Sequence, residues 1–373
     1  MVYLDYAANT PVNEEVLTAF CKAARQYQGN ANSKHAEGLA AKAEMERITI
    51  SVANLLGVKP AEIIFTSGAT EANNTAIKGL AQATQGLGRH IISTPLEHSS
   101  VTGCLRTLQK QGYEVDYLSL QADGKINLPE LQAKLRSDTV LLAICAVDSE
   151  LGTIQPLAEI VKILQNYPHC HLHVDATQAI GKIDFSLQGI STLSFAPHKF
   201  YGLGGSGILF KRKNVDLVPL LEGGASTTSY RSGTPALALA ASVEVALKLA
   251  LAKRQSRWLE VKQKQNFLRQ QLTQYPKVHI NSPKEGSPYI LNLSVAGVRG
   301  QNFQRALNEM GVCVSVRSAC SSDGQPSAAV LALTHDYWNA LSSWRLSLSH
   351  LTSETDLQEF LTAFSQCYEK LTK

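Results

Sequence analysis

Residues 171–175 read His171-Leu172-His173-Val174-Asp175, and residues 193–199 read Leu193-Ser194-Phe195-Ala196-Pro197-His198-Lys199. Each is a short apolar run that ends in polar side chains, a pattern typical of a buried strand followed by a loop. An acid, Asp175, therefore ends one strand, and a lysine, Lys199, follows the next. These are the two groups that a pyridoxal phosphate (PLP) enzyme must supply. The lysine amine forms a Schiff base with the cofactor aldehyde, and the carboxylate keeps the pyridine nitrogen protonated.

Short apolar runs alternate with helical stretches through the first two-thirds of the chain. This alternation predicts an α/β fold with a mostly parallel sheet. Ligand sites in such sheets gather at the carboxyl ends of the strands, where these polar residues fall. The expected strands are Ile63–Thr66, His90–Thr94, Val115–Leu118, Val140–Val147, His171–Asp175, Thr192–Ala196 and Gly207–Phe210, and the expected helices include Leu39–Leu56, Glu71–Thr84, Ser99–Gln111 and Leu157–Gln165.

The character of the sequence changes after Thr234. A long helical region, Pro235–Tyr275, leads into a strand at Tyr289–Val295 and a last helix at Ser353–Leu371. We therefore expect a large domain of residues 12–254 and a smaller α+β domain of residues 255–373, which residues 1–11 join.

Composition and charge argue against several classes of function. The chain has 373 residues, of which 44% are hydrophobic and 18% charged, and its formal net charge is +4 with no run of like charges. These values are ordinary for a globular protein and indicate no nucleic-acid partner. We find no signal-peptide pattern and no apolar stretch that could cross a membrane. The seven cysteines are dispersed without a CxxC pair, so we expect a reducing compartment, the cytoplasm.

A further polar turn, Phe65-Thr66-Ser67-Gly68-Ala69-Thr70-Glu71, joins an expected strand to an expected helix. Unpaired N–H groups at a helix start, with the Thr70 hydroxyl, would bind a phosphate dianion, and Gly68 lets the backbone approach it closely. Taken alone, the turn is more simply explained as a helix cap. His98 stands at another strand-to-helix junction, where it could stack on a pyridine ring and take part in proton transfer.

A metal site is an alternative interpretation of His169-Cys170-His171-Leu172-His173. His171 and His173 would project from one face of a strand. Because the segment runs directly into Asp175, a buried strand explains it better, and we expect no metal. We interpret Cys104, Cys145 and Cys313 as structural thiols.

Together these motifs resemble those of the group I cysteine desulfurases (NifS/IscS-like), PLP-dependent enzymes of the class V aminotransferase family. The resemblance covers nearly the whole chain and implies the aspartate aminotransferase-like fold, PLP-dependent transferase fold type I. The motifs that carry it are Tyr3-Leu4-Asp5-Tyr6-Ala7-Ala8-Asn9-Thr10-Pro11-Val12, Ser67-Gly68-Ala69-Thr70-Glu71, Glu97-His98, His173-Val174-Asp175-Ala176-Thr177-Gln178, His198-Lys199, Arg231-Ser232-Gly233-Thr234, Ser318-Ala319-Cys320 and Trp344-Arg345-Leu346-Ser347.

The resemblance implies residues that bind the cofactor ring. Lys199 would hold PLP as a Schiff base and would act as the base that removes the α-proton of the substrate. Asp175 would pair with the ring nitrogen, and Gln178 would bond to the phenolic oxygen. His98 would stack on the ring and belong to the catalytic set.

It also implies residues for the phosphate and the substrate. The Ala69 backbone, Thr70 and His198 would hold the phosphate. Thr234 would reach the phosphate of the neighbouring subunit, which implies a homodimer with shared sites. Arg345 would bind the substrate carboxylate through both prongs of its guanidinium.

Cys320 would be the nucleophile. Its surroundings, Ser318–Ser327, are small and polar and include glycine and proline, which is typical of a mobile loop. The resemblance implies that Cys320 attacks the sulfur of L-cysteine as a thiolate, so that L-alanine is released and a persulfide remains on Cys320. The persulfide would pass to an acceptor protein, such as an iron–sulfur cluster scaffold or a thiolation partner.

The sequence departs from the family pattern at several positions. Ser149 replaces an asparagine that would contact the cofactor ring or the substrate, and Ala196 replaces a phosphate-binding serine. The polar segment before Arg231 also differs, at Ser226-Thr227-Thr228-Ser229-Tyr230. Loss of one phosphate hydrogen bond costs about 1–3 kcal/mol if nothing compensates. We therefore expect weaker PLP retention, or an altered rate and choice of acceptor, with the chemistry kept.

Other functions use the same cofactor residues. A PLP-dependent C–S lyase would form pyruvate from cystine or cysteine without needing Cys320. A selenocysteine lyase would keep the chemistry with another substrate. A catalytically weak sulfur-relay scaffold would keep only the fold, and the complete set of Lys199, Asp175, Cys320 and Arg345 counts against it.

Overall fold

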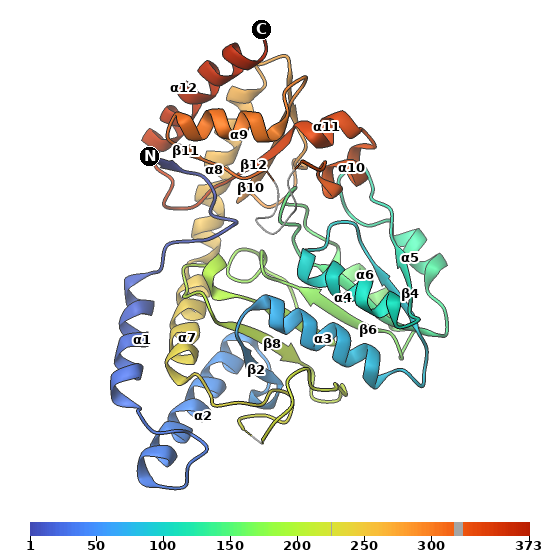
Figure 1. Cartoon of the computed structure of the whole chain (residues 1–373), viewed down its shortest axis with the longest axis vertical. Helices are drawn as coiled ribbons and strands as arrows, with labels where there is room; N and C mark the ends of the chain where they lie inside the picture. Colours follow the sequence, from blue (N-terminus) through green and yellow to red (C-terminus); the bar gives the residue numbers. More distant parts are fainter. Residues whose placement is uncertain (225, 317–323) are drawn as a thin grey trace.

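A seven-stranded sheet forms the centre of the larger part of the molecule (Figure 1). The computed structural model describes residues 1–373 apart from residue 225 and residues 317–323. The strands lie in the order β2-β8-β7-β6-β5-β3-β4. Their bounds are β2 Ile63–Thr66, β3 His90–Ser93, β4 Glu114–Tyr117, β5 Thr139–Cys145, β6 His171–Asp175, β7 Thr192–Phe195 and β8 Gly207–Lys211, within a residue or two of the expected ones.

Most neighbours in this sheet run parallel, as predicted. β3 pairs in parallel with β4 and β5, β5 with β6, and β6 with β7, whereas β8 runs antiparallel to both β7 and β2. The chain passes from β3 to β4 on one side and then returns to β5 on the other side of β3. Connections diverge at such a reversal and leave a crevice beyond the carboxyl ends of the strands.

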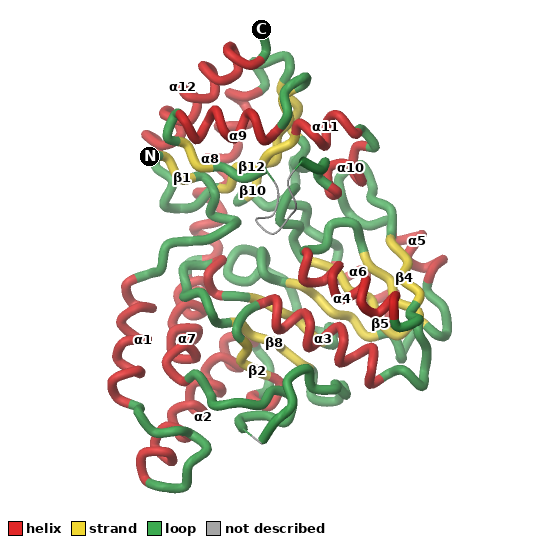
Figure 2. Tube along the Cα trace, in the orientation of Figure 1, coloured by secondary structure: helices red, strands yellow, loops and turns green. Residues whose placement is uncertain are grey.

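β5 shows why several of these strands are continuous apolar runs. Leu142 and Ile144 belong to a hydrophobic cluster with α2, α6 and α7, while Leu141 and Ala143 belong to another with α3 and α4. Because helices cover both faces of the sheet (Figure 2), both sets of side chains are buried. The helices are α1 Glu14–Gln26, α2 Ala36–Leu56, α3 Ala69–Ala83, α4 Ser99–Lys110, α5 Leu128–Lys134, α6 Leu157–Leu164 and α7 Leu237–Ala252, and short 3₁₀ turns lie at Pro60–Glu62 and Pro197–Lys199.

A separate hydrophobic cluster surrounds a three-stranded antiparallel sheet, in the order β12-β10-β9. Its centre is aromatic, because Phe303 stacks on Trp344 with ring centroids 5.3 Å apart and Phe364 packs beside both. The remaining elements are β1 Val2–Tyr3, β9 Val278–Ile280, β10 Ile290–Val295, β11 Val312–Cys313, β12 Ser343–Ser347, α8 Arg254–Leu272, α9 Gly300–Glu309, α10 Ala328–Thr334, α11 Tyr337–Ser342 and α12 Glu354–Leu371.

The N-terminal segment belongs to this second cluster. Val2, Leu4 and Ala7 are buried in it, and β1 pairs in parallel with β11. The two clusters support the division into residues 12–254 and residues 255–373 with residues 1–11, which stays a prediction. The helical region expected at Pro235–Tyr275 is two helices, α7 and α8, that meet at Lys253.

Within the residues that the structure describes, no helix combines the length and apolarity that crossing a bilayer requires.

Candidate active site

One cavity collects most of the residues that the sequence singles out. It has a volume of about 320 Å³, within the usual range of small-molecule sites. It lies beyond the carboxyl ends of β5 and β6, and the N-terminal segment, the start of α3 and β12 complete its walls. The predicted site residues that line it are Ala69, Thr70, His98, Ser149, Asp175, Gln178, His198, Lys199 and Arg345.

Two predicted site residues are not in this set. Thr234 is exposed and does not line the cavity. Cys320 lies outside the described residues.

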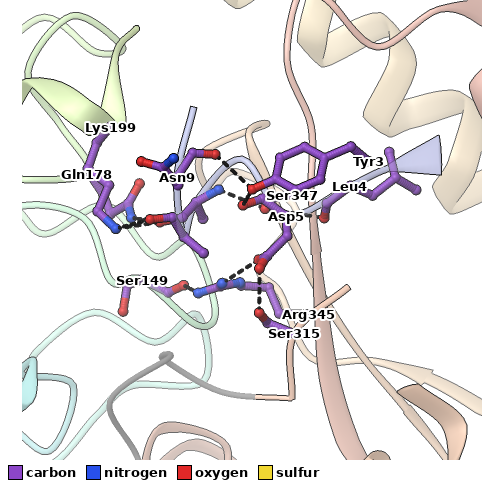
Figure 3. Close-up of polar contacts among 12 residues, drawn as sticks. Tyr3, Leu4, Asp5, Asn9, Ser149, Gln178, Lys199, Ser315, Arg345 and Ser347 are labelled. Carbon is purple, nitrogen blue, oxygen red and sulfur yellow. Dashed lines mark hydrogen bonds and ion pairs between the residues drawn. The ribbon is translucent and has the colours of Figure 1, made fainter. Parts of the chain in front are cut away.

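Lys199 ends the short 3₁₀ turn that follows β7. Its Nζ donates hydrogen bonds to the carbonyl oxygens of Ala7 at 3.0 Å and Ala8 at 2.6 Å (Figure 3). Thr10 donates to the carbonyl oxygen of His198 through both its backbone N–H and its hydroxyl. The N-terminal segment therefore fixes both the lysine amine and the turn that carries it.

Asp175 is the last residue of β6, and its buried carboxylate is held on both oxygens. Asn73 Nδ2 donates to Oδ2 at 2.8 Å, and the backbone N–H of Thr177 donates to Oδ1 at 3.0 Å. Asn73 comes from α3 and also donates to the Ser100 hydroxyl at 2.8 Å. The orientation of the carboxylate is thus set by α3 and by the loop after β6.

His173 extends this buried network. Asn73 donates to Asp175 through its amide nitrogen, so its oxygen accepts from His173 Nε2 at 3.0 Å and from the Ser194 hydroxyl. His173 Nδ1 lies 2.9 Å from the Thr192 hydroxyl and accepts from it. Burial lowers the pKa of His173 to about 4, although Asp175 opposes the shift, so the ring is neutral. Both ring nitrogens have hydrogen-bond partners, Asn73 in α3 and Thr192 in β7, which removes His173 as a metal ligand.

The start of α3 has the properties of a phosphate site. Gly68 precedes the helix with φ of 157° and ψ of 176°, and no side chain caps this end. The first N–H groups of a helix have no partner within the helix, and its dipole favours an anion there. Gly207 lies directly against this turn, because an added Cβ would lie 2.5 Å from the Gly68 carbonyl carbon.

Two neutral histidines line the cavity. Burial lowers the pKa of His98, with Asp175 opposing it. His98 Nδ1 accepts from the Ser100 N–H at 3.1 Å, so its proton is on Nε2. Burial, followed by the charges of Lys199 and Lys182, lowers the pKa of His198 to about 4.

A buried lysine that the sequence analysis did not assign fixes Gln178. Lys182 Nζ donates to Gln178 Oε1 at 2.7 Å, and Gln178 Nε2 donates to the Ala7 carbonyl oxygen at 2.9 Å. Burial, with Lys199 and Arg345 adding to it, lowers the pKa of Lys182 to about 7. The orientation of the Gln178 amide is therefore determined.

Arg345 is buried in β12 and held by polar contacts from two segments (Figure 3). Its Nη2 donates to Asp5 Oδ1 and its Nη1 donates to the Ser149 carbonyl oxygen, each at 2.8 Å. Its Nε is buried without a hydrogen-bond partner among the described residues. Ser149, expected as a substrate contact, thus meets Arg345 through its main chain.

Glu97 and Cys145 form a protonated pair beside the cavity. Glu97 Oε1 accepts from the Thr94 hydroxyl at 2.7 Å and from the Cys145 N–H at 2.9 Å. Burial raises the pKa of Glu97 to about 8. Burial also raises the pKa of the Cys145 thiol, and Glu97 adds to this, so the thiol stays protonated although it lines the cavity.

These groups fit PLP. The uncapped helix start suits a phosphate, the buried carboxylate of Asp175 suits a protonated pyridine nitrogen, and the Lys199 amine suits the aldehyde. Thr177 Oγ1 is buried and has no hydrogen-bond partner among the described residues, although Thr177 lines the cavity. A bound polar group would satisfy it.

A group of potential metal ligands lies elsewhere, at His90, Glu114 and Asp116 on β3 and β4. Arg136 pairs with Glu114 at 2.8 Å and Lys134 with Asp116 at 3.4 Å. Because these cations already balance both carboxylates, we assign no metal to this group.

The sequence analysis missed Asn73, Thr177 and Asp5. Thr177 and Asp5 lie inside motifs that carried the family resemblance, so their position was a usable signal. Asn73 carried no such signal. Nothing local distinguishes it from Asn74, whose amide bonds only to the Thr70 carbonyl within the same helix.

Comparison with known proteins identifies the family of the chain. The aminotransferase class-V family matches residues 2–360. "Cysteine desulfurase IscS" of Dictyoglomus turgidum is 36% identical over 99% of this chain and 95% of its own length. The structure of a "NifS-like protein" is 34% identical with a TM-score of 0.92, covering 100% of this chain and 99% of that one. "SspA in complex with cysteine" is 30% identical with a TM-score of 0.83, covering 95% and 100%. The chain belongs to the class V aminotransferase family of PLP enzymes, among its NifS/IscS-like cysteine desulfurases.

Proposed function

We propose that the chain converts L-cysteine to L-alanine with PLP and carries the removed sulfur as a persulfide on Cys320. The observation that carries this proposal is the meeting of Lys199, Asp175 and Arg345 at one cavity of ligand size. The similar proteins support the substrate, because one is titled a cysteine desulfurase and another a complex with cysteine.

Different described residues would bind different parts of PLP. The start of α3, with Thr70 and His198, would hold the phosphate, and Asp175 would hold the ring nitrogen protonated. His98 would lie on the ring, and Gln178 would face its phenolic oxygen. When bound, PLP supplies an electron sink for the negative charge that develops at the substrate α-carbon.

Arg345 and Lys199 would act on the substrate itself. Arg345 would bind the α-carboxylate, since its Nε has no partner among the described residues. Lys199 would move the α-proton. While the Lys199 amine is not bonded to PLP, the carbonyl oxygens of Ala7 and Ala8 would hold it near the substrate.

The proposed sulfur transfer conserves atoms and electrons and needs no external oxidant. The Cys320 thiolate would attack the sulfur of the substrate, so an S–S bond forms as the substrate C–S bond breaks. The electron pair of the broken bond stays with the substrate carbon, which takes up a proton and becomes the methyl group of alanine. The sulfur is oxidised to the sulfane level and the carbon is reduced. A thiolate of an acceptor protein, such as an iron–sulfur scaffold, would then take the outer sulfur.

Three further features belong to this proposal. Thr234 is exposed, as a residue must be if it reaches the phosphate site of a second subunit in a homodimer. The six described cysteines are all free, as expected for a protein of the reducing cytoplasm. The boundary between the two domains would lie near residue 254.

The test is to incubate PLP-loaded protein with L-cysteine and dithiothreitol and to measure alanine and pyruvate together. We expect wild type to form alanine, and Cys320→Ser to lose it while keeping the borohydride-sensitive absorbance of bound PLP. Pyruvate that survives the substitution would make the protein a C–S lyase. Alanine formed from selenocysteine but not from cysteine would make it a selenocysteine lyase.

A further inference from the structure

Asp5 is the acidic residue that contacts Arg345 (Figure 3). Asp5 Oδ1 accepts from Arg345 Nη2 at 2.8 Å, and Oδ2 accepts from the Ser315 hydroxyl at 2.7 Å. We propose that Asp5 is a positioning residue, which fixes the Arg345 guanidinium in the orientation that receives the substrate carboxylate. The inference rests on the proposed function, in which Arg345 binds that carboxylate.

The backbone holds Asp5 on the strand that carries Arg345. The N–H of Ser347 in β12 donates to the Leu4 carbonyl oxygen at 2.7 Å, and Asp5 forms an isolated parallel bridge with Ser347. The Ser347 hydroxyl accepts from the Ala7 N–H at 2.8 Å. The main chain on both sides of Asp5 is therefore held against Ser347, which places the Asp5 side chain beside Arg345.

Two contacts at different nitrogens fix the plane of the guanidinium. Asp5 accepts from Nη2 and the Ser149 carbonyl oxygen accepts from Nη1. A planar guanidinium held at two nitrogens cannot rotate, and its other N–H groups stay available to a second carboxylate. Ordering a long side chain before the substrate arrives removes that entropic cost from substrate binding.

Asp5 affects binding of the substrate carboxylate in two opposite ways, through the orientation of Arg345 and through its own negative charge. Asp5 compensates the charge of a guanidinium whose side chain is only 2% exposed. The same negative charge repels the substrate carboxylate. Asp5→Ala removes the contact altogether. Asp5→Asn keeps an acceptor oxygen for Nη2, and its amide donates to the Ser315 hydroxyl, so it removes the charge and keeps the orientation.

The experiment measures kcat and KM for L-cysteine in PLP-loaded Asp5→Ala, Asp5→Asn and Arg345→Gln, and in the double variant Asp5→Ala with Arg345→Gln. A hydrogen bond to a charged group leads us to expect about a 10-fold higher KM in Asp5→Ala, with kcat within about threefold of wild type. Asp5→Asn should have a KM within about threefold of wild type or below it. The double variant should have the KM of Arg345→Gln, because Asp5 acts through Arg345.

Tyr3→Phe is the matched control. Tyr3 Oη donates to the carbonyl oxygens of Asp5 at 3.2 Å and Asn9 at 3.0 Å, so its loss loosens the same segment without touching Arg345. We expect it to keep the wild-type KM. The dissociation constant of the product, L-alanine, measured from the absorbance of bound PLP, should rise in Asp5→Ala by the same factor as KM.

An unchanged KM in Asp5→Ala, an equal rise in Tyr3→Phe, an equal rise in Asp5→Asn, or additive effects in the double variant would each overturn the inference. If Asp5→Ala does not fold, Asp5→Ser replaces it, because the shorter serine side chain does not reach Arg345 Nη2, and an unchanged KM there has the same meaning as in Asp5→Ala. Failure of the proposed function looks different: wild type forms no alanine, or Arg345→Gln keeps the wild-type KM.

Discussion

At the scale of single residues, the site depends on polar groups that are buried but almost fully partnered. Asp175 is a clear case, because both of its oxygens accept hydrogen bonds from other groups of the protein, the Asn73 amide and the Thr177 N–H. The sequence could identify Asp175 from its place at the end of an apolar run. It could not identify Asn73, because the contacts of Asn73 with His173 and Asp175 join residues about a hundred positions apart.

Asn73→Ala tests this network. The substitution leaves Asp175 Oδ2 and His173 Nε2 buried without their partner, and each such loss costs about 1–3 kcal/mol. We expect a lower midpoint of thermal unfolding and faster loss of PLP on gel filtration. Asn74→Ala is the control, since the Asn74 amide bonds only within α3, and it should retain PLP as wild type does. Equal retention in both variants would contradict the network's role.

Glu97 gives a prediction for the dependence of stability on pH. In the folded protein burial raises its pKa to about 8, above the ordinary value of 4.5. Between those values the folded state binds one proton more than the unfolded state. The free energy of unfolding therefore falls as the pH rises, by about 1.4 kcal/mol per unit. Glu97→Gln cannot titrate and lacks this contribution.

We expect wild type to lose about 2 kcal/mol more stability than Glu97→Gln between pH 6 and pH 8, measured by denaturant unfolding at several pH values. Other titrating groups are common to both proteins and cancel in the comparison. Parallel curves for the two proteins would show that Glu97 ionises normally.

At the scale of elements, the turn that we propose for the PLP phosphate depends on how β8 meets the start of α3. Gly207 begins β8, and an added Cβ would lie 2.5 Å from the Gly68 carbonyl carbon and 2.8 Å from the Thr66 hydroxyl. Backbone atoms cannot move aside cheaply, so the turn before α3 would shift. The helix N–H groups would then leave their positions.

We expect Gly207→Ala to weaken PLP binding at least 10-fold and to destabilise the fold by about 1–3 kcal/mol. Gly204→Ala, in the loop before β8, is its control, because an added Cβ there meets no atom of the described residues within 4 Å. Titration of the apo forms with PLP, followed by absorbance, measures both affinities. The explanation is wrong if the two variants bind PLP alike.

At the scale of the whole molecule, the alternation of strands and helices was sufficient to predict the large sheet. The seven strands lie within a residue or two of their expected bounds. Most of them are buried apolar runs, whereas the edge strand β4 is partly exposed and carries Glu114 and Asp116. The break between α7 and α8 was not predictable, since Ala252-Lys253-Arg254 contains only good helix formers. Helix α1 was overlooked although Asn13 caps it and Glu14 and Glu15 open it, which is a recognisable signal.

The candidate site also contains residues that the sequence identifies and contacts that it does not. Residues inside recognisable motifs, such as Lys199 and Arg345, could be named from the sequence. The contacts that hold them could not, because they come from the N-terminal segment and depend on how the chain folds back on itself. For this reason, Asp5 was named in the N-terminal motif but was given no role there.

The pairing of β1 with β11 has a consequence for how the protein is made. Val2 and Tyr3 leave the ribosome long before their strand partners Val312 and Cys313, and Asp5 leaves it long before Arg345. A nascent chain that has emerged only as far as β8 already contains Asp175 and Lys199, but not Arg345. The chain must be made at least as far as Arg345 before the cavity can close, so a product that stops earlier could have the large sheet and still bind no substrate.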